Sequence, residues 1–184
     1  MIIQLKNGVV DLVQQADKSK MKEAKYNVGD IARYVINYVN NNGDLISNLK
    51  LQKVLYFIQA KFLVDIGYPC FNEEIEAWSM GVVVPSVYHE YKRYGAGCIL
   101  PVEEFFVYSD DIFECKYVKY SDDIIDDCDK KAINEIINKC ANYSDFQLTS
   151  ITRNQTPYIK AYYIFKSLRR KIVSKDDIYD FFKD

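Results

Sequence analysis

The chain has few of the residues on which most enzyme and metal sites depend. Its 184 residues contain one histidine, His89, and no Walker A, G-x-G-x-x-G or H-E-x-x-H pattern. The five cysteines form no C-x-x-C pair and offer no familiar spacing for a four-ligand zinc site. We therefore expect no catalytic residue, no cofactor and no metal site.

His89 is the one imidazole available as a base, and Ser86 precedes it by three residues. A nucleophile normally lies on a sharp turn beside an oxyanion hole, so a Ser–His pair this close in sequence rarely forms a dyad. We interpret His89 as a helix-surface residue or as part of an aromatic cluster with Tyr88 and Tyr91.

The cysteine number is odd, and the spacing does not suggest a disulfide framework. We expect reduced, mostly buried thiols. Cys128 and Cys140 lie within one helical pattern, which predicts that both thiols face the core from the same side of a helix.

Long apolar runs are also absent. The longest uncharged run, residues 77–89, contains 13 residues, whereas a membrane helix needs about 20. The first residues lack the basic and apolar regions of a secretory signal. The net charge of −2 argues against strong sequence-independent binding to nucleic acid. We expect a soluble cytoplasmic protein with no membrane contact.

What the chain does contain is a composition of 49% hydrophobic and 15% aromatic residues, enough for one compact domain. Helical spacing of apolar residues follows Asn27 and Ser47, and the second of these patterns, residues 49–66, is apolar on two sides. We expect this helix to end at Gly67 and to lie at the centre of the fold.

Further elements are expected along the rest of the chain. Residues 75–78 predict a short strand or a buried turn, and residues 103–120 predict a β-hairpin with a turn at 109–111. Helices are expected to begin at the following residues: Pro85, Ser121, Ser144, Pro157 and Ser174.

Together these patterns predict a mainly α fold. We expect a compact bundle of about six or seven helices around a central apolar helix, with a small β-hairpin or short sheet. The lysine-rich residues 1–26 form an N-terminal extension, and residues 27–184 form the domain.

Charge is unevenly distributed. Residues 102–129 hold ten acids and two lysines, whereas residues 130–175 hold ten bases and two acids. Either the two segments neutralise each other or are solvated, or each forms a charged rim for a protein partner. The acids at residues 122–127 suit a helix N-terminus, where negative charge offsets the helix dipole.

Two stretches are specific enough to compare with a family. Residues 49–60 read LKLQKVLYFIQA, and residues 71–88 read FNEEIEAWSMGVVVPSVY, followed by YKRYG at 91–95. This combination resembles the Panacea domain family, which includes SocA-like antitoxins and phage-associated GepA-like proteins. The family pattern is K-L-Q-K-L-L-Y-F-x-Q-A, then E-x-I-E-A-W-x-x-G-P-V-V-P-x-V-Y.

A weaker match follows at residues 146–161, similar to the family's L-x-x-L-T-H and P-W-x-x-A segments. Val82 stands where the family usually has proline, Ser150 where it has histidine, and Tyr158 where it has tryptophan. We therefore assign no functional role to Ser150.

The resemblance implies an antitoxin-like, non-enzymatic protein of a bacterium, a phage or a mobile element. It implies neutralisation of a cognate toxin by direct protein–protein binding, and delivery of a toxin to a ClpXP-type protease. An alternative is a phage or prophage inhibitor of a host defence or protease system.

Several motif residues are candidates for partner contacts. Glu76 either pairs with Lys50 or Lys53 and fixes the loop on the helix, or these groups face a partner. Three tyrosines either pack a short helix or supply interface contacts. The candidate partner-binding residues are Lys50, Lys53, Glu76, Tyr88, Tyr91 and Tyr94. The residues expected to build the motif are Leu51, Leu55, Trp78, Gly81 and Pro85.

Two further functions are weaker hypotheses. A carboxylate-dependent hydrolase would use acid pairs such as Glu73 with Glu76 or Glu103 with Glu104. Autoregulatory DNA binding would use a basic, aromatic helix at residues 153–175.

Overall fold

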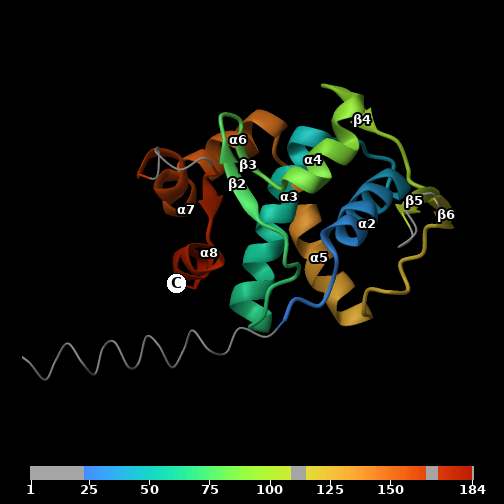
Figure 1. Cartoon of the computed structure of the whole chain (residues 1–184), viewed down its shortest axis with the longest axis horizontal. Helices are drawn as coiled ribbons and strands as arrows, with labels where there is room; N and C mark the ends of the chain where they lie inside the picture. Colours follow the sequence, from blue (N-terminus) through green and yellow to red (C-terminus); the bar gives the residue numbers. More distant parts are fainter. Residues whose placement is uncertain (1–22, 109–114, 165–169, 184) are drawn as a thin grey trace, which may run out of the picture.

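The structure is a computed structural model that describes residues 23–108, 115–164 and 170–183. Within these residues the chain forms seven α-helices and seven short β-strands. The predicted mainly α class with short sheets is confirmed. Figure 1 shows the helices gathered into one body, with a two-stranded element at one side.

The first two described helices begin at the predicted residues. α2 spans Val28–Asn41, and the side chain of Asn27 accepts a hydrogen bond from the first turn. α3 spans Asn48–Lys61, and Ser47 caps it in the same way. These side chains satisfy backbone N–H groups that a first helical turn leaves without partners.

α3 continues into a π-helical turn, η1, which spans Phe62–Ile66. The chain leaves this turn at Gly67, whose φ of +82° lies in the left-handed region that glycine adopts readily. The helix therefore ends where the sequence predicts, although its last turn is wider than an α-helix.

Three strands form the largest sheet, in the order β3–β2–β7. β2 (Ile75–Trp78) pairs antiparallel with β3 (Gly81–Val83) and, at its other edge, with β7 (Ile172–Val173). The predicted strand at 75–78 is confirmed. β7 has only two residues, which is too short for any sequence pattern to indicate.

A second, two-residue ladder joins β1 (Ile46–Ser47) to β4 (Cys98–Ile99). Between β3 and β4 lies α4 (Pro85–Tyr91), which has proline in its first turn as predicted. A 3₁₀ turn, η2 (Lys92–Tyr94), completes this segment before the glycine-rich stretch that follows.

The predicted hairpin is confirmed as the β5–β6 ribbon. β5 (Glu104–Tyr108) pairs antiparallel with β6 (Cys115–Lys119) over five residues. The predicted turn at residues 109–111 lies outside the described residues. Figure 1 shows the ribbon at the side of the molecule, near α2.

The prediction that a helix begins at Ser121 is wrong. α5 spans Asp127–Ala141. Ser121 Oγ instead donates to the carboxylate of Asp123 at 2.6 Å and accepts from Asp123 N at 3.2 Å. Such local side-chain hydrogen bonds compete with helix formation and favour a turn.

α6 spans Asp145–Arg153 and begins at a capping box formed by Ser144 and Gln147. α7 (Thr156–Ile159) follows and widens into a second π-helical turn, η3 (Lys160–Ile164). The predicted basic segment, residues 153–175, is therefore not a single helix, and its residues 165–169 lie outside the described residues.

The last helix, α8, spans Lys175–Phe182. Its cap matches the predicted one, because Ser174 Oγ accepts from Asp177 N at 3.1 Å and donates to the Asp177 carboxylate at 2.8 Å. Ile178 is fully buried and anchors the helix in the core.

The core does not depend on one apolar helix. α3 contacts α2, α4, α5, α6 and α8, but it also buries polar side chains. These are Asn48, Gln52, Lys53 and Gln59. The predicted central apolar helix is therefore not confirmed. No helix among the described residues is both long and apolar enough to cross a membrane.

All five cysteines are free thiols, but the prediction that most are buried is wrong. Cys70 and Cys140 are buried, whereas Cys98, Cys115 and Cys128 are exposed. Twelve residues correspond to about 3.3 helical turns, so Cys128 and Cys140 point to different sides of α5.

Residues 1–22 of the predicted extension lie outside the described residues. The end of that segment contacts the helical body, because Tyr26 N donates to Cys70 O at 3.1 Å and Tyr26 OH donates to Asp129 at 2.6 Å. Lys25 Nζ also bonds to Asp129 and to Asp126.

Candidate partner-binding site

The two family-like stretches meet where α3 packs on β2, β3 and α4. Gln52 Oε1 accepts a hydrogen bond from Val84 N at 2.9 Å, and Gln52 Nε2 donates to Asn48 Oδ1 at 2.8 Å. Asn48 in turn donates to Tyr88 O at 3.1 Å. Buried side chains of α3 thus satisfy the backbone at the entry to α4 and inside it.

Gln59 makes the same kind of contact near the C-terminal end of α3. Its Oε1 atom accepts from Cys70 N at 3.0 Å and from Phe71 N at 3.2 Å, and its Nε2 atom donates to Phe71 O at 3.1 Å. A fully buried amide therefore pairs three backbone groups of a segment that has little regular structure of its own.

Lys53 is buried between α3 and β3, with 0% of its surface exposed. Its Nζ atom donates to Val82 O at 3.0 Å. Burial lowers the pKa of Lys53 to about 7, with an opposing contribution from Asp145. Lys53 therefore lies inside the fold and is not on the surface, where a partner-binding residue was expected.

Gly81 explains why this lysine fits. Its φ is +95°, and a Cβ atom there would lie 3.0 Å from Thr152 Oγ1 and 3.1 Å from Lys53 Cε. Glycine is thus required both by the backbone conformation and by the space that the β2–β3 turn shares with Lys53 and α6.

The expected pairing of Glu76 with Lys50 or Lys53 is wrong. Glu76 accepts from Trp78 Nε1 at 2.8 Å and from Arg170 Nε at 2.7 Å. Partial burial alone would raise the pKa of Glu76, but the two hydrogen bonds outweigh it and the pKa lies below its usual value. Glu76 thereby orients the indole ring.

Trp78, Tyr88 and His89 form an aromatic cluster, here called the Trp78 cluster. The ring centroids of Trp78 and Tyr88 lie 5.0 Å apart, and those of Tyr88 and His89 lie 5.4 Å apart. Trp78 and Tyr88 are half-buried and His89 is exposed, so the cluster reaches the surface. The interpretation of His89 as a member of an aromatic cluster is confirmed, with Trp78 in place of Tyr91.

The other tyrosines of this segment differ in exposure. Tyr91 is 3% exposed and belongs to the core, whereas Tyr94 is half-buried with its ring centroid 6.5 Å from that of Tyr91. Lys50 is half-buried, and its charge acts on the thiol of Cys140 in α5. A partner role stays a prediction for all six residues: Lys50, Lys53, Glu76, Tyr88, Tyr91 and Tyr94.

The residues expected to build the motif lie where that role requires. Leu51 and Leu55 are fully buried, and Pro85 occupies the first turn of α4. Val82, which replaces the family's usual proline, is buried in β3 and supplies the carbonyl that Lys53 binds. Ser150 is exposed on α6.

An open apolar groove was not predicted from the sequence. It has a volume of about 420 Å³ and lies between α3, α5, α6 and α8. Its apolar walls come from residues including Phe57, Ile136, Leu148, Ile151 and Phe182. These residues fit ordinary helical core patterns, so only the packing of the helices reveals that part of their surface is open.

The two acid pairs considered for a hydrolase have different surroundings. Glu73 Oε1 accepts from Val28 N at 3.2 Å, whereas Glu76 is engaged by Trp78 and Arg170. Glu103 and Glu104 are exposed at the base of the ribbon. Neither pair lies among the residues that line the groove.

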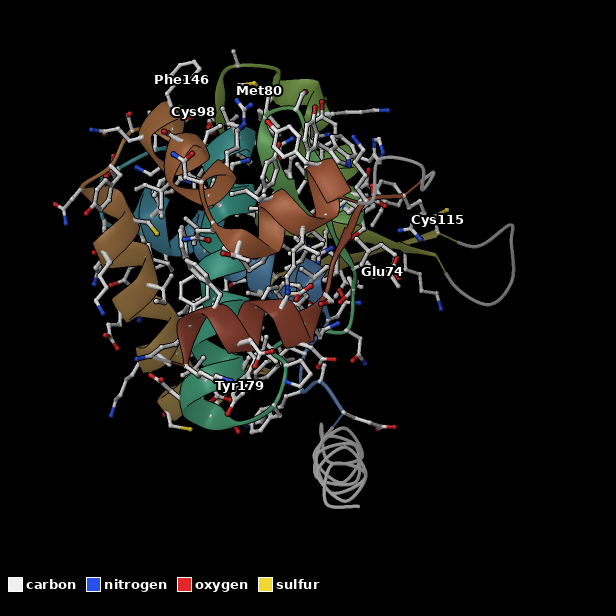
Figure 2. All side chains as sticks on the ribbon, turned by 90° about the vertical axis from the view of Figure 1, so that its left-hand side faces the viewer. Glu74, Met80, Cys98, Cys115, Phe146 and Tyr179 are labelled. Carbon is white, nitrogen blue, oxygen red and sulfur yellow. The ribbon has the colours of Figure 1, made fainter. Side chains whose placement is uncertain are left out.

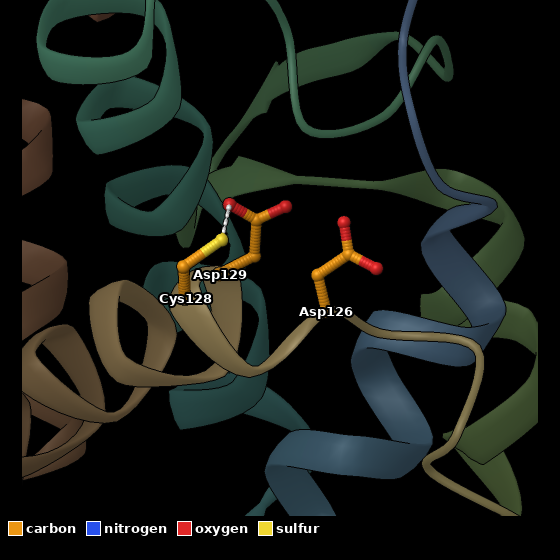
Figure 3. Close-up of side chains that lie close together, drawn as sticks. All are labelled: Asp126, Cys128 and Asp129. Carbon is orange, nitrogen blue, oxygen red and sulfur yellow. Dashed lines mark hydrogen bonds between the residues drawn. The ribbon is translucent and has the colours of Figure 1, made fainter.

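Asp126, Cys128 and Asp129 lie close together at the start of α5, as Figure 3 shows. Cys128 Sγ donates weakly to Asp129 at 3.8 Å. Both carboxylates bind Lys25, which raises the pKa of that lysine, chiefly through its hydrogen bond to Asp126. The arrangement serves to attach the start of the described chain to α5.

The described bases of the basic segment are engaged within the chain. Lys160 pairs with Asp177, and Arg170 pairs with Glu74 at 2.7 Å as well as with Glu76. Lys130 lies 3.3 Å from Asp122 and links the two oppositely charged segments. The uneven charge is thus balanced mostly by residues outside the two segments.

Comparison with known proteins agrees with this geometry. The family model "Antitoxin SocA-like, Panacea domain" matches residues 51–159. The chain is also 49% identical over 55 residues to the Antitoxin SocA of Caulobacter vibrioides, strain NA1000 / CB15N. That match covers 30% of this chain and 29% of the relative's length. No solved structure matches.

The matched residues contain most of the contacts described above, from Gln52 and Gln59 of α3 to the Trp78 cluster and α6. Since the family model covers more than half of the chain, the chain belongs to the SocA-like antitoxin family with a Panacea domain.

Proposed function

We propose that this protein is an antitoxin that neutralises a protein toxin by direct binding. The observation that carries the proposal is its membership of the SocA-like Panacea family. The polar residues of the motif form hydrogen bonds within the fold, which also supports the proposal. Gln52, Lys53 and Gln59 bind backbone groups, which fits a motif that builds a platform for a partner.

We place the toxin contact at the Trp78 cluster. Its rings are amphipathic, and aromatic side chains of this kind dominate the energetics of protein interfaces. Arg170 and Glu76 fix the indole ring, so binding would cost little side-chain entropy. Met80, at the tip of the β2–β3 turn, extends the apolar surface and is 44% exposed.

Co-expression with the product of the adjacent gene tests the function. The neighbour should stop growth when expressed alone, and the wild-type chain should restore growth and copurify with it. The double change Tyr88→Ala and His89→Ala should abolish rescue, because it removes the edge-on ring of Tyr88 and the tilted ring of His89 that lie beside Trp78.

Tyr179→Ala is the matched control, since Tyr179 is 40% exposed on α8 and should leave rescue unchanged. Figure 2 shows Tyr179 near one end of the molecule and Met80 near the other. A neighbour that is harmless alone and does not copurify would refute the function. Full rescue by the double variant would refute only the site.

The adaptor role and the phage alternative extend this proposal and can be separated from it. If the chain delivers its toxin to a ClpXP-type protease, toxin half-life should shorten when the chain is added to purified protease. If the chain acts on a host defence or protease system, the locus should carry prophage genes and no adjacent toxin.

A further inference from the structure

The β5–β6 ribbon differs from every other strand pair in how little covers it. All five residues of β6 are exposed, including Tyr117 at 66%, and Phe106 of β5 is 49% exposed. Figure 2 shows Cys115 standing well away from the helices. A two-stranded ribbon is marginal alone in water, and within the described residues no third strand joins it.

The base of the ribbon is held firmly on α2. Asn37 Nδ2 donates to Val102 O at 2.8 Å, and Asn37 Oδ1 accepts from Val102 N at 2.7 Å. The guanidinium of Arg33 lies 3.7 Å from the ring centroid of Phe105. The ribbon therefore leaves the body in a fixed direction.

The free edge of β6 has a defined hydrogen-bonding pattern. Tyr120 N donates to Glu103 O at 2.8 Å, so Tyr120 and Glu103 are a hydrogen-bonded pair. In an antiparallel ladder such pairs alternate, so Val118 and Lys116 also bond to β5 through their backbone groups. The backbone groups that point outward from β6 therefore belong to Cys115, Tyr117 and Lys119. An edge of this kind is a template for another strand.

We propose that β6 pairs antiparallel with β6 of a second copy of this chain, about a twofold axis at Tyr117. In this register the two β6 strands overlap along all five residues, and their outward-pointing backbone N–H and C=O groups face each other. The two Tyr117 side chains then lie side by side. Because Phe106 and Tyr117 already lie 3.9 Å apart between ring centroids, an aromatic row would cross the four strands. The same symmetry centred on Lys116 or Val118 would overlap only three residues.

The charges favour this register. Lys119 faces Glu104 within its own ribbon and would face Cys115 of the second copy. A register centred on Lys116 would instead oppose two like charges. In the proposed register the two Lys116 side chains are diagonal neighbours and do not face each other. An edge of this length gives an interface at the small end of the range, and the dimer should be weak.

Disulfide trapping tests the axis directly. The background variant replaces the three exposed cysteines by serine: C98S, C115S and C128S. In this background Tyr117→Cys should form a covalent dimer on mild oxidation. Opposed residues of a hydrogen-bonded pair have Cα atoms about 5.5 Å apart, within the range of a disulfide.

Val118→Cys in the same background is the matched control. Val118 faces Lys116 of the second copy and points to the opposite side of the ribbon, so it should cross-link at least about tenfold more slowly. Equal cross-linking of the two variants would refute the register.

Sedimentation equilibrium of the purified wild-type chain tests self-association without any new cysteine. The dimer fraction should rise with protein concentration. Tyr117→Pro should abolish the dimer and keep the circular dichroism spectrum, because it removes an outward N–H and no hydrogen bond inside the ribbon. A wild-type chain that stays monomeric at millimolar concentration would overturn the proposal. None of these measurements involves a toxin, so they stand apart from the proposed function.

Discussion

Two short antiparallel strand pairs in this molecule are held in opposite ways. β3 packs against α3 and α6, β2 contacts η3, and the backbone around β3 binds buried side chains of α3. The β5–β6 ribbon is attached at its base, through Asn37 and Arg33, and is exposed beyond it. The difference shows that strand length does not decide how well a pair is held.

What decides it is the supply of buried hydrogen-bonding side chains. Gln52, Lys53 and Gln59 lie on one helix and reach backbone groups at residues 70–71, 82 and 84. Removing one of them leaves buried polar groups without partners, which costs more than the lost bond itself. Beyond its base at Asn37, the described part of the ribbon has no such side chain, so the same kind of substitution should cost little there.

The largest effect is expected for Gln59→Leu. The leucine keeps the volume but leaves three backbone groups without the bonds that the amide provides, so the free energy of unfolding should fall by about 4 kcal/mol. Urea unfolding followed by circular dichroism measures this loss. Gln147→Leu, on an exposed residue of the α6 cap, should cost about 1 kcal/mol. Equal losses would show that the buried amide is not special.

Gly81→Ala should have the next largest effect. The added Cβ combines an unfavourable positive φ with contacts near 3.0 Å, and a loss of about 3 kcal/mol in the free energy of unfolding follows. Gly43 provides the control, because its φ is +78° but no atom lies within 4 Å of an added Cβ. Gly43→Ala should cost only the conformational part, about 1 kcal/mol. The difference measures how tightly Lys53 and Thr152 enclose the β2–β3 turn.

Lys53 gives the contact between α3 and the β2–β3 turn a dependence on pH. Burial lowers its pKa from 10.5 to about 7, so above pH 7 the unfolded chain binds more protons than the folded one. Stability from this group therefore rises with pH from about 7 toward 10.5 and is lost as pH falls through 7.

Lys53→Met removes this contribution. The difference in free energy of unfolding between wild type and variant should shift in favour of wild type by about 2 kcal/mol from pH 7.5 to 9. Urea unfolding of both chains at each pH measures it, and other titrating groups cancel in the difference. A difference that does not change with pH would mean that Lys53 stays charged in the folded chain.

The same contrast explains what the sequence could predict. The helix starts at Asn27, Ser47 and Ser174 depend on capping hydrogen bonds between residues that are close in sequence. The ribbon was predictable because its alternation is local too. The helix start predicted at Ser121 was wrong because serine and aspartate occur equally in helix caps and in turns. Which of the two forms depends on how residues 121–126 fold back on themselves.

The candidate site was harder, because its decisive contacts join distant residues. Trp78 and Arg170 both bind Glu76, although Arg170 lies 94 residues further along the chain than Glu76. Lysine is usually a surface residue, so the sequence does not indicate that Lys53 is buried. In the structure its side chain is enclosed beside Gly81. The sequence did contain one signal of a tight turn, Gly81, which follows Trp78 and precedes an apolar run.

The smallest effect is expected in the ribbon. Tyr117→Ala removes a ring that is 66% exposed, and its backbone groups point away from the ribbon's own ladder, so the free energy of unfolding of the monomer should change by less than about 0.5 kcal/mol. Urea unfolding at low protein concentration measures this, and Tyr56→Ala is the opposite extreme. Tyr56 is fully buried, and its hydroxyl donates to Gln155 at 2.8 Å. If Tyr117→Ala cost as much as a core substitution, the ribbon would belong to the cooperative unit of α3 and the sheet, and the contrast between the two strand pairs would fail.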